Sequence, residues 1–223
     1  MTRRVMIATP VQYGMLDVWF VNSMRHTEIL CRQNGIEVVP IYRAFDALIQ
    51  RARNDLVSDA LSGGFDEMIF IDGDEEWSPE WVLRLLQHDV DVVGAAYRKK
   101  TDNEELYTVR AKLPIPVCQK TGLWIVDGVG TGFVRLTRRA LQALWDSCEE
   151  YENDGRTCRW IFDVCVVNRR LVSEDNIMCM KLQQLGFTIF LDPTFTVTHI
   201  GPKKYVGDFA KYMQRRMEAV QAA

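Results

Sequence analysis

The chain has 223 residues and a net charge of −3, and 48% of its residues are hydrophobic. This length and composition allow a core of ordinary size, whereas the acidic balance argues against a dedicated nucleic-acid-binding protein. The sequence contains no run of about 18 apolar residues, which argues against a membrane-spanning helix.

The charges are divided unequally between the two halves of the chain. Residues 1–97 contain 8 Lys and Arg against 15 Asp and Glu, a balance of −7. Residues 98–223 contain 19 against 15, a balance of +4. An acidic half binds a phosphorylated ligand poorly unless a cation mediates, whereas a basic half can contact a polyanion directly. The asymmetry suggests two different partners, with ordinary surface charge as the alternative.

Six cysteines are scattered along the chain with no Cys-x-x-Cys pair and no zinc-type spacing. They are Cys31, Cys118, Cys148, Cys158, Cys165 and Cys179. We interpret them as core thiols in a reducing compartment. Residues 1–10 include basic side chains, but their apolar run is too short for a secretory signal. We therefore expect a cytoplasmic protein.

The first 71 residues predict strands that alternate with helices. The expected strands cover residues 5–9, 37–42 and 67–71, and the expected helices cover residues 17–33 and 46–61. Pro10 ends the first apolar run, which suits a buried strand followed by a loop. Strands joined by helices build a parallel sheet with helices on its faces. The predicted fold class is therefore α/β.

The remaining residues predict a less regular second half. Helices are expected over residues 79–88, 138–150 and 173–185 and from residue 207 onward, and strands over residues 90–97, 124–126, 132–136, 188–191 and 195–198. Ser78 and Pro79 are a helix cap and a first helical residue, which makes the helix after them well defined. The segments 98–123 and 151–159 are predicted to be loops.

Asp72-Gly73-Asp74 directly follows the third predicted strand. Ligands of parallel α/β sheets bind beyond the carboxyl ends of the strands, where Thr9 and Pro10 also lie. Two carboxylates that are separated by one residue can converge on a hard cation, and a glycine between them lets the backbone turn sharply. The turn alone predicts a metal or ribose site only weakly, because Asp-Gly turns are common.

Two other interpretations of this turn fail. A calcium-binding EF-hand loop that began at Asp72 would need glycine at position 77 and glutamate at position 83, where the chain has Trp77 and Leu83. A phosphatase-type aspartate would follow the first strand, where Thr9 and Pro10 stand instead.

Residues 68–79, Met-Ile-Phe-Ile-Asp-Gly-Asp-Glu-Glu-Trp-Ser-Pro, resemble the Asp-x-Asp segment of GT-A-fold glycosyltransferases, close to family 2 and its small phage-borne relatives. In that family a hydrophobic strand runs into Asp-x-Asp, and a helix that starts with proline follows. The resemblance continues at residues 52–54, 128–133, 173–175 and 199–201. It implies one GT-A domain over residues 1–223 with a mostly parallel, Rossmann-like sheet, a nucleotide-sugar-binding half (1–97) and an acceptor-binding and catalytic half (98–223).

The resemblance also implies a metal-dependent donor site. It assigns metal binding to Asp72, Asp74 and His199, with ribose binding as the alternative for Asp72 and a packed histidine as the alternative for His199. A mixed carboxylate and imidazole set suits Mn²⁺ better than Mg²⁺, so we expect manganese, with magnesium as the alternative. The expected contacts to a UDP-sugar are Thr9, Pro10, Arg53, Asn54, Asp72, Gly73, Gly130, Thr131 and Gly132. A tight hairpin without a ligand is the alternative for the glycine segment.

Glu174 and Asp175 are similar to the acidic pair that supplies the general base in that family. The implied base is Asp175, with Glu174 as its orienting neighbour or an acceptor ligand. The implied mechanism is a single displacement with inversion, in which Asp175 takes the hydroxyl proton as that oxygen attacks the anomeric carbon. Acidic residues in the first turn of a helix are also favourable without any catalysis. The run Arg98-Lys99-Lys100 predicts either a cationic lid over a diphosphate or a solvated charged segment.

The acceptor has several candidates. The resemblance to phage proteins and the basic second half favour a 5-hydroxymethylpyrimidine in phage DNA, which would place the protein in the host cytoplasm. A cell-surface glycan or a protein remains an alternative, as does a non-catalytic nucleotide- or glycan-binding module of the same fold. A nucleotidyltransferase is disfavoured because no glycine-rich basic loop follows the first strand.

Overall fold

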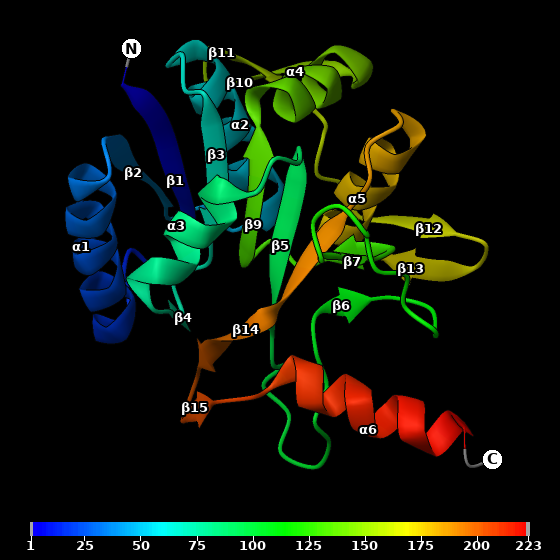
Figure 1. The fold of residues 1–223 in the computed structure, drawn as a ribbon. Helices are drawn as coiled ribbons and strands as arrows, with labels where there is room; N and C mark the ends of the chain where they lie inside the picture. The colour runs from blue at the N-terminus through cyan, green and yellow to red at the C-terminus, as the bar shows by residue number, and fades with distance from the viewer. Residues whose placement is uncertain (1, 222–223) are drawn as a thin grey trace.

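A nine-stranded sheet runs through residues 2–221, the part of the chain that the computed structural model describes (Figure 1). Seven strands follow one another in the order β15-β14-β5-β9-β3-β1-β2. They are β15 (Lys204–Tyr205), β14 (Phe190–Ile200), β5 (Val92–Tyr97), β9 (Phe133–Thr137), β3 (Glu67–Ile71), β1 (Arg3–Val11) and β2 (Ile36–Ala44). Two short strands, β4 (Glu75–Glu76) and β7 (Trp124–Ile125), pair with β14.

Of the six longest strands within residues 2–221, five point in the same direction. Strand β1 pairs in parallel with β2 and β3, and β5 pairs in parallel with β14. Strand β9 lies between β3 and β5 and is antiparallel to both, so that β3 and β5 share a direction. The predicted α/β fold with a mostly parallel sheet is confirmed. The carboxyl ends of β1, β3 and β5 consequently meet at one edge of the sheet.

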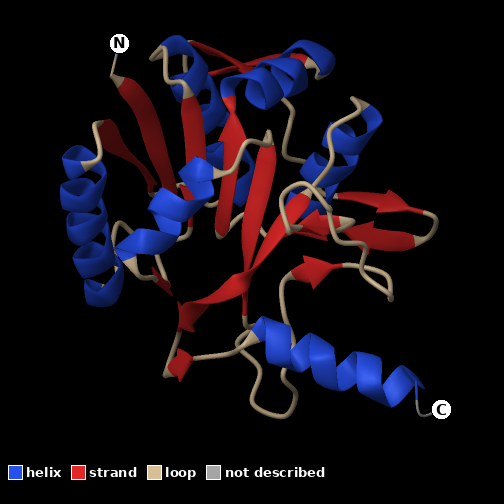
Figure 2. Cartoon of the chain, in the orientation of Figure 1, coloured by secondary structure: helices blue, strands red, loops and turns tan. Residues whose placement is uncertain are grey.

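Helices cover both faces of the sheet (Figures 1 and 2). They are α1 (Val18–Gln33), α2 (Ile49–Ser62), α3 (Pro79–Gln87), α4 (Arg138–Ser147), α5 (Glu174–Gln184) and α6 (Phe209–Gln221). Helices α1 and α3 contribute Phe20 and Leu85 to the apolar cluster on one face. Helices α2, α4 and α5 contribute Leu56, Leu141 and Met178 to the cluster on the other. Helices α1, α3 and α4 bury one face and expose the other, as amphipathic helices do, whereas α2 buries six consecutive residues, 52–57.

Strand β3 is buried on both faces, which explains the continuous apolar run that predicted it. Met68 and Phe70 enter the cluster beneath α2, α4 and α5, whereas Ile69 and Ile71 enter the cluster beneath α1 and α3. This alternation follows from the two-residue period of a strand. The double burial fixes the strand and therefore the position of the residues that follow Ile71.

The segment 151–159 was predicted to be a loop, and that prediction is wrong. Strands β10 (Glu150–Asn153) and β11 (Arg156–Arg159) pair antiparallel across a two-residue turn. In that turn Asp154 and Gly155 have φ values of 49° and 75°, the left-handed conformation of Asp-Gly hairpin turns. The strands escaped prediction because their side chains are mostly polar and only half of the residues are exposed, so no clear hydrophobic alternation marks them.

Three other features of the second half refine the prediction. Residues 98–123 form an irregular segment, as expected, in which the structure describes β6 (Val109–Arg110), paired with β8 (Gly128–Val129). Strands β12 (Cys165–Val167) and β13 (Arg170–Val172) form a hairpin that the sequence did not predict. The two strands expected over residues 188–198 are one strand, β14, whose register shifts between Leu191 and Thr196.

The two halves of the sequence share the central sheet, because β9 and β14 of the second half flank β5 of the first. The division of labour between these halves stays a prediction. Among the helices of residues 2–221, none combines the length and hydrophobicity needed to cross a bilayer.

Candidate functional site

The turn at residues 72–74 lies where three strands end or begin. The backbone N–H of Asp72 donates to the carbonyl of Gly132, at the start of β9, over 3.1 Å. The N–H of Ile200, at the end of β14, donates to the carbonyl of Asp74 over 2.7 Å. The turn is therefore fixed by backbone hydrogen bonds to segments from the second half of the chain.

Arg53 connects this turn to the first turn of α5. Its side chain is buried on α2, and its Nη2 lies 3.0 and 3.3 Å from the two carboxylate oxygens of Asp72. Its Nη1 donates to the carboxylate of Glu174. Burial lowers the pKa of Arg53, but the charges of Asp72 and Glu174 outweigh it and the pKa is raised, so the guanidinium stays charged. Three residues predicted for the site are thus in direct contact.

Asp74, Glu75 and His199 form a second cluster beside the first. One ligand atom from each residue lies within 4.8 Å of the other two. His199 Nε2 is 3.6 Å from Asp74 Oδ2 and 3.9 Å from Glu75 Oε1. His199 Nδ1 lies 2.9 Å from the carbonyl of Arg98, and since a carbonyl only accepts, Nδ1 carries the proton. Nε2 is therefore the nitrogen that faces the carboxylates, as in metal sites where a hydrogen bond orients the imidazole.

Glu75 is a buried carboxylate that a cation would stabilise. Its side chain is fully buried, and among the described residues neither carboxylate oxygen has a hydrogen-bond partner. Burial and then the charges of Asp72 and Asp74 raise the pKa of Glu75 well above its ordinary value. A buried carboxylate without a partner is costly unless a proton or a cation neutralises it. The donor set therefore fits a divalent metal.

The cluster of candidate ligands differs from the metal-binding set expected from the sequence. Asp74 and His199 lie together as predicted, whereas Asp72 is bound by Arg53 and lies outside the cluster of candidate ligands. Glu75, which the sequence did not single out, takes the third position. It is the cross-strand partner of His199 in the β4–β14 pair. The sequence offered only its place beside Asp-Gly-Asp as a signal.

The glycines at positions 130 and 132 make room for Tyr97. A Cβ at Gly130 would lie 2.2 Å from the Tyr97 hydroxyl oxygen, and a Cβ at Gly132 would lie 2.8 Å from the same atom. The hydroxyl accepts a hydrogen bond of 3.1 Å from the N–H of Gly132. The edge of the Tyr97 ring meets His199, with centroids 5.3 Å apart. The glycine segment thus supports His199, and with it the cluster of candidate ligands, through Tyr97.

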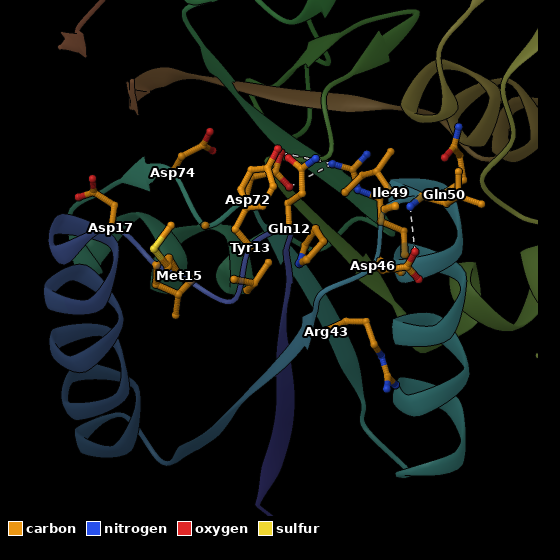
Figure 3. Close-up of a pocket in the computed structure, with 18 residues that line it drawn as sticks. Gln12, Tyr13, Met15, Asp17, Arg43, Asp46, Ile49, Gln50, Asp72 and Asp74 are labelled. Carbon is orange, nitrogen blue, oxygen red and sulfur yellow. Dashed lines mark hydrogen bonds and ion pairs between the residues drawn. The ribbon is translucent and has the colours of Figure 1, made fainter. Parts of the chain in front are cut away.

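A cavity of about 910 Å³ opens beside the turn (Figure 3). Of the predicted site residues, those that line it are Pro10, Arg53, Asp72, Gly73 and Asp74. A Cβ at Gly73 would lie 2.9 Å from Leu16, so the glycine keeps the backbone close to the loop after β1. Tyr13 and Met15 on this loop are 69% and 76% exposed. The cavity lining therefore holds four aspartates against Arg43 and Arg53, and its rim is apolar.

Three residues that were predicted to contact the UDP-sugar do not line the cavity. Asn54 is fully buried, and its amide oxygen accepts from the backbone N–H groups of Ile161 and Phe162 over 3.2 and 2.8 Å, outside the cavity lining. Thr9 and Thr131 are also buried, and among the described residues neither hydroxyl has a hydrogen-bond partner. None of these three residues lines the cavity.

Asp175 lies at the start of α5, next to Glu174. Its Oδ1 accepts from the hydroxyl of Ser173 and, over 2.7 Å, from the backbone N–H of Asn176. The side chain is partly exposed and does not line the cavity. The Arg53 bridge to Glu174 nevertheless ties this helix start to the Asp72 turn.

No protein-family model matches the chain, and a search of curated proteins finds no match either. Solved structures do match. A197 from STIV aligns with a TM-score of 0.54 and 17% identity over 92% of this chain and 87% of that one. S. aureus TarS 1-349, solved in complex with UDP-GlcNAc, aligns with a TM-score of 0.50 and 12% identity over 94% of this chain and 60% of that one. At these identities the likeness shows a shared fold, and it confirms the GT-A type architecture expected from the sequence.

Proposed function

We propose that the protein is a metal-dependent glycosyltransferase that transfers a sugar from a UDP-sugar to a hydroxyl acceptor with inversion. The observation that carries the proposal is the cluster of Asp74, Glu75 and His199 beside the 910 Å³ cavity. Asp74 belongs to both, so a cation held by the cluster would face a ligand in the cavity. The fold shared with a protein solved in complex with UDP-GlcNAc supports the choice of donor.

The cavity suits a nucleotide sugar in size and in chemistry. Ligand pockets of about 300–1,000 Å³ hold molecules of this class, and the cavity volume of 910 Å³ falls in that range. Tyr13 and Met15 on the rim offer apolar surface to a nucleobase. Asp17, Asp46, Asp72 and Asp74 outnumber Arg43 and Arg53 in the lining, so a divalent cation beside Asp74 would favour the binding of a diphosphate. The two features together favour a nucleoside diphosphate bound with a metal.

Asp74, Glu75 and His199 would hold the metal. Their oxygen and nitrogen donors suit Mn²⁺, with Mg²⁺ as the alternative. A divalent cation at this position supplies neutralisation of the negative charge that develops on the departing diphosphate. Tyr97 and the Arg98 carbonyl orient the imidazole of His199 from behind.

The transfer step needs a base for the acceptor hydroxyl, and we assign that role to Asp175. The acceptor oxygen forms a bond to the anomeric carbon while the bond from that carbon to the diphosphate breaks. The hydroxyl proton passes to the carboxylate of Asp175, and the electron pair leaves with the diphosphate. Glu174 is held by Arg53, so it positions the helix start rather than accepting the proton.

The acceptor class is the finer part of the proposal. The second half of the chain carries the +4 balance, which favours a polyanionic acceptor such as DNA that contains hydroxymethylated pyrimidines. A glycan or a protein side chain would not need this charge.

A panel of nucleotide sugars with Mn²⁺, followed by hydrolysis and by transfer to hydroxymethylated DNA, tests the proposal. We expect release of UDP from one donor, dependence on Mn²⁺ and, with DNA, a steep loss of affinity as salt rises. Donor binding without sugar release from any donor would instead identify a non-catalytic binding module. A salt-independent transfer would exclude DNA as the acceptor.

A further inference from the structure

Lys100 makes the closest contact between a cation and the candidate metal cluster. Its Nζ lies 2.5 Å from Oδ2 of Asp74, and both side chains are partly exposed. Oδ2 is also the carboxylate oxygen that lies 3.6 Å from His199 Nε2. The lysine ammonium therefore occupies one side of the oxygen that a metal held by Asp74 and His199 would use.

The position of Lys100 is built into two segments of the chain. The loop after β5 closes on itself, since the N–H of Lys99 donates to the Leu106 carbonyl over 2.8 Å and the Thr101 hydroxyl donates to the Glu104 carbonyl over 2.7 Å. The aliphatic stem of Lys100 crosses Gly201, where a Cβ would lie 3.2 Å from Lys100 Cδ. Glycine at position 201 thus leaves a path for the lysine to reach Asp74.

The charges around the turn explain why a lysine is found there. Asp72 has Arg53 as its cationic partner, and Asp74 has Lys100. Among the described residues the oxygens of Glu75 have no hydrogen-bond partner. A divalent metal bound to Asp74 and Glu75 would repel an ammonium on the same oxygen, so the two cations compete for Asp74.

We propose that Lys100 is a place-holding cation, which leaves Asp74 when a divalent metal binds and then contacts the diphosphate of the donor. The first part needs only the metal, whereas the second rests on the proposed function. Lys100 lies on a loop that borders the cluster, and its long flexible stem lets the ammonium move without the backbone. The lysine is thus a positioning residue for metal and donor.

Titration of Mn²⁺ into the protein without nucleotide, followed by calorimetry, tests the first part. Replacing the ammonium by an apolar stem of similar length, Lys100→Met, should tighten Mn²⁺ binding about three- to tenfold, because a competing cation is lost. Lys99→Met is the matched control, since Lys99 is an exposed neighbour without an ion pair among the described residues. It should change the affinity by less than about twofold. Unchanged or weaker Mn²⁺ binding in Lys100→Met would overturn the proposal.

UDP binding at saturating Mn²⁺ tests the second part. Lys100→Met should weaken UDP binding about three- to tenfold, whereas Lys100→Arg, which keeps the charge, should lose less. The same substitution should thus tighten metal binding and weaken nucleotide binding. A purely structural lysine does not produce these opposite effects. Unchanged UDP affinity in Lys100→Met overturns the diphosphate contact. Failure of the unaltered protein to bind UDP would contradict the proposed function instead, and the Mn²⁺ titration still decides the place-holding role.

Discussion

The turn at residues 72–74 and the hairpin β12–β13 differ in how much of the surrounding structure holds them in place. The turn follows a strand buried on both faces, and hydrogen bonds from β9 and β14 fix its backbone. The hairpin extends from the body of the molecule (Figure 1), and Val166 and Leu171 on it are 69% and 75% exposed. The position of the turn is fixed by the core, whereas the hairpin is held mainly by the pairing of its own two strands.

The turn is part of the central sheet that the fold requires, whereas the hairpin is a surface element that the fold could lose. A rigid strand end suits a donor site, because a metal and a diphosphate need ligands held in one geometry. An exposed hairpin can change without cost to the core, as surface segments that carry specificity usually can. Stability and metal binding should therefore depend on the turn and its partners and not on the hairpin.

Loss of Arg53 should have the largest effect. Arg53→Met leaves Asp72 and Glu174 without their shared partner, and breaking a buried ion pair in this way costs about 3–5 kcal/mol. Urea unfolding measures the loss. Arg51→Met on the same helix is the control, because the side chain of Arg51 is 40% exposed and pairs with one carboxylate, that of Asp46, so a smaller loss of about 1 kcal/mol is expected. Equal losses for the two variants would show that the bridge does not hold the site.

Removal of the charge of Glu75 should have the second-largest effect, after the loss of Arg53. Glu75→Gln keeps the shape of the side chain but replaces a carboxylate ligand, and we expect Mn²⁺ affinity to fall by about 10–100-fold. Without metal the variant should be at least as stable as the unaltered protein, because a buried unpaired carboxylate is removed. Glu76→Gln, next to it in β4 and paired with Lys204 at 2.6 Å, is the control for metal titration. Full Mn²⁺ affinity in Glu75→Gln would remove Glu75 from the ligand set.

Much of the fold could be predicted because its signals are local. The apolar run that became β3 and the proline that begins α3 each act within a few residues. The β10–β11 hairpin was missed because exposed strands do not alternate in hydrophobicity, although its Asp154-Gly155 turn is a local signal that could have revealed it.

The site was only partly predictable because its contacts are not local. Glu75 meets His199 through strand pairing between distant parts of the sequence. Arg53 and Asn54 are adjacent on α2, but consecutive helical residues point in directions about 100° apart. Only Arg53 lines the cavity, while Asn54 fixes the backbone at residues 161–162. The motif therefore predicted a helix beside the cavity without telling which of its side chains lines that cavity.

Acid should moderately lower the stability of the start of β14, where Asp192 lies. Burial raises the pKa of Asp192, but hydrogen bonds from His88 and Thr194 outweigh it and lower the pKa below the ordinary 3.8. A lowered pKa means that this stabilisation is complete above pH 3.8 and is lost as the pH falls below it. Asp192→Asn should cost about 1–2 kcal/mol at pH 7 and reduce the acid dependence of unfolding, with Mn²⁺ affinity unchanged. The same acid dependence in both proteins would assign it to other carboxylates.

Polar substitution of the β12–β13 hairpin should have the smallest effect on the fold. Val166 and Leu171 are cross-strand partners on an exposed face, so Val166→Ser with Leu171→Ser should change the free energy of unfolding by no more than about 0.5 kcal/mol. Mn²⁺ and UDP affinities should also stay unchanged, because the hairpin has no residue in the cavity lining. If transfer to an acceptor then falls while donor hydrolysis is retained, the hairpin contributes to acceptor binding. A loss of UDP affinity would show instead that donor and acceptor regions are coupled, and the contrast between a fixed turn and a free hairpin would fail.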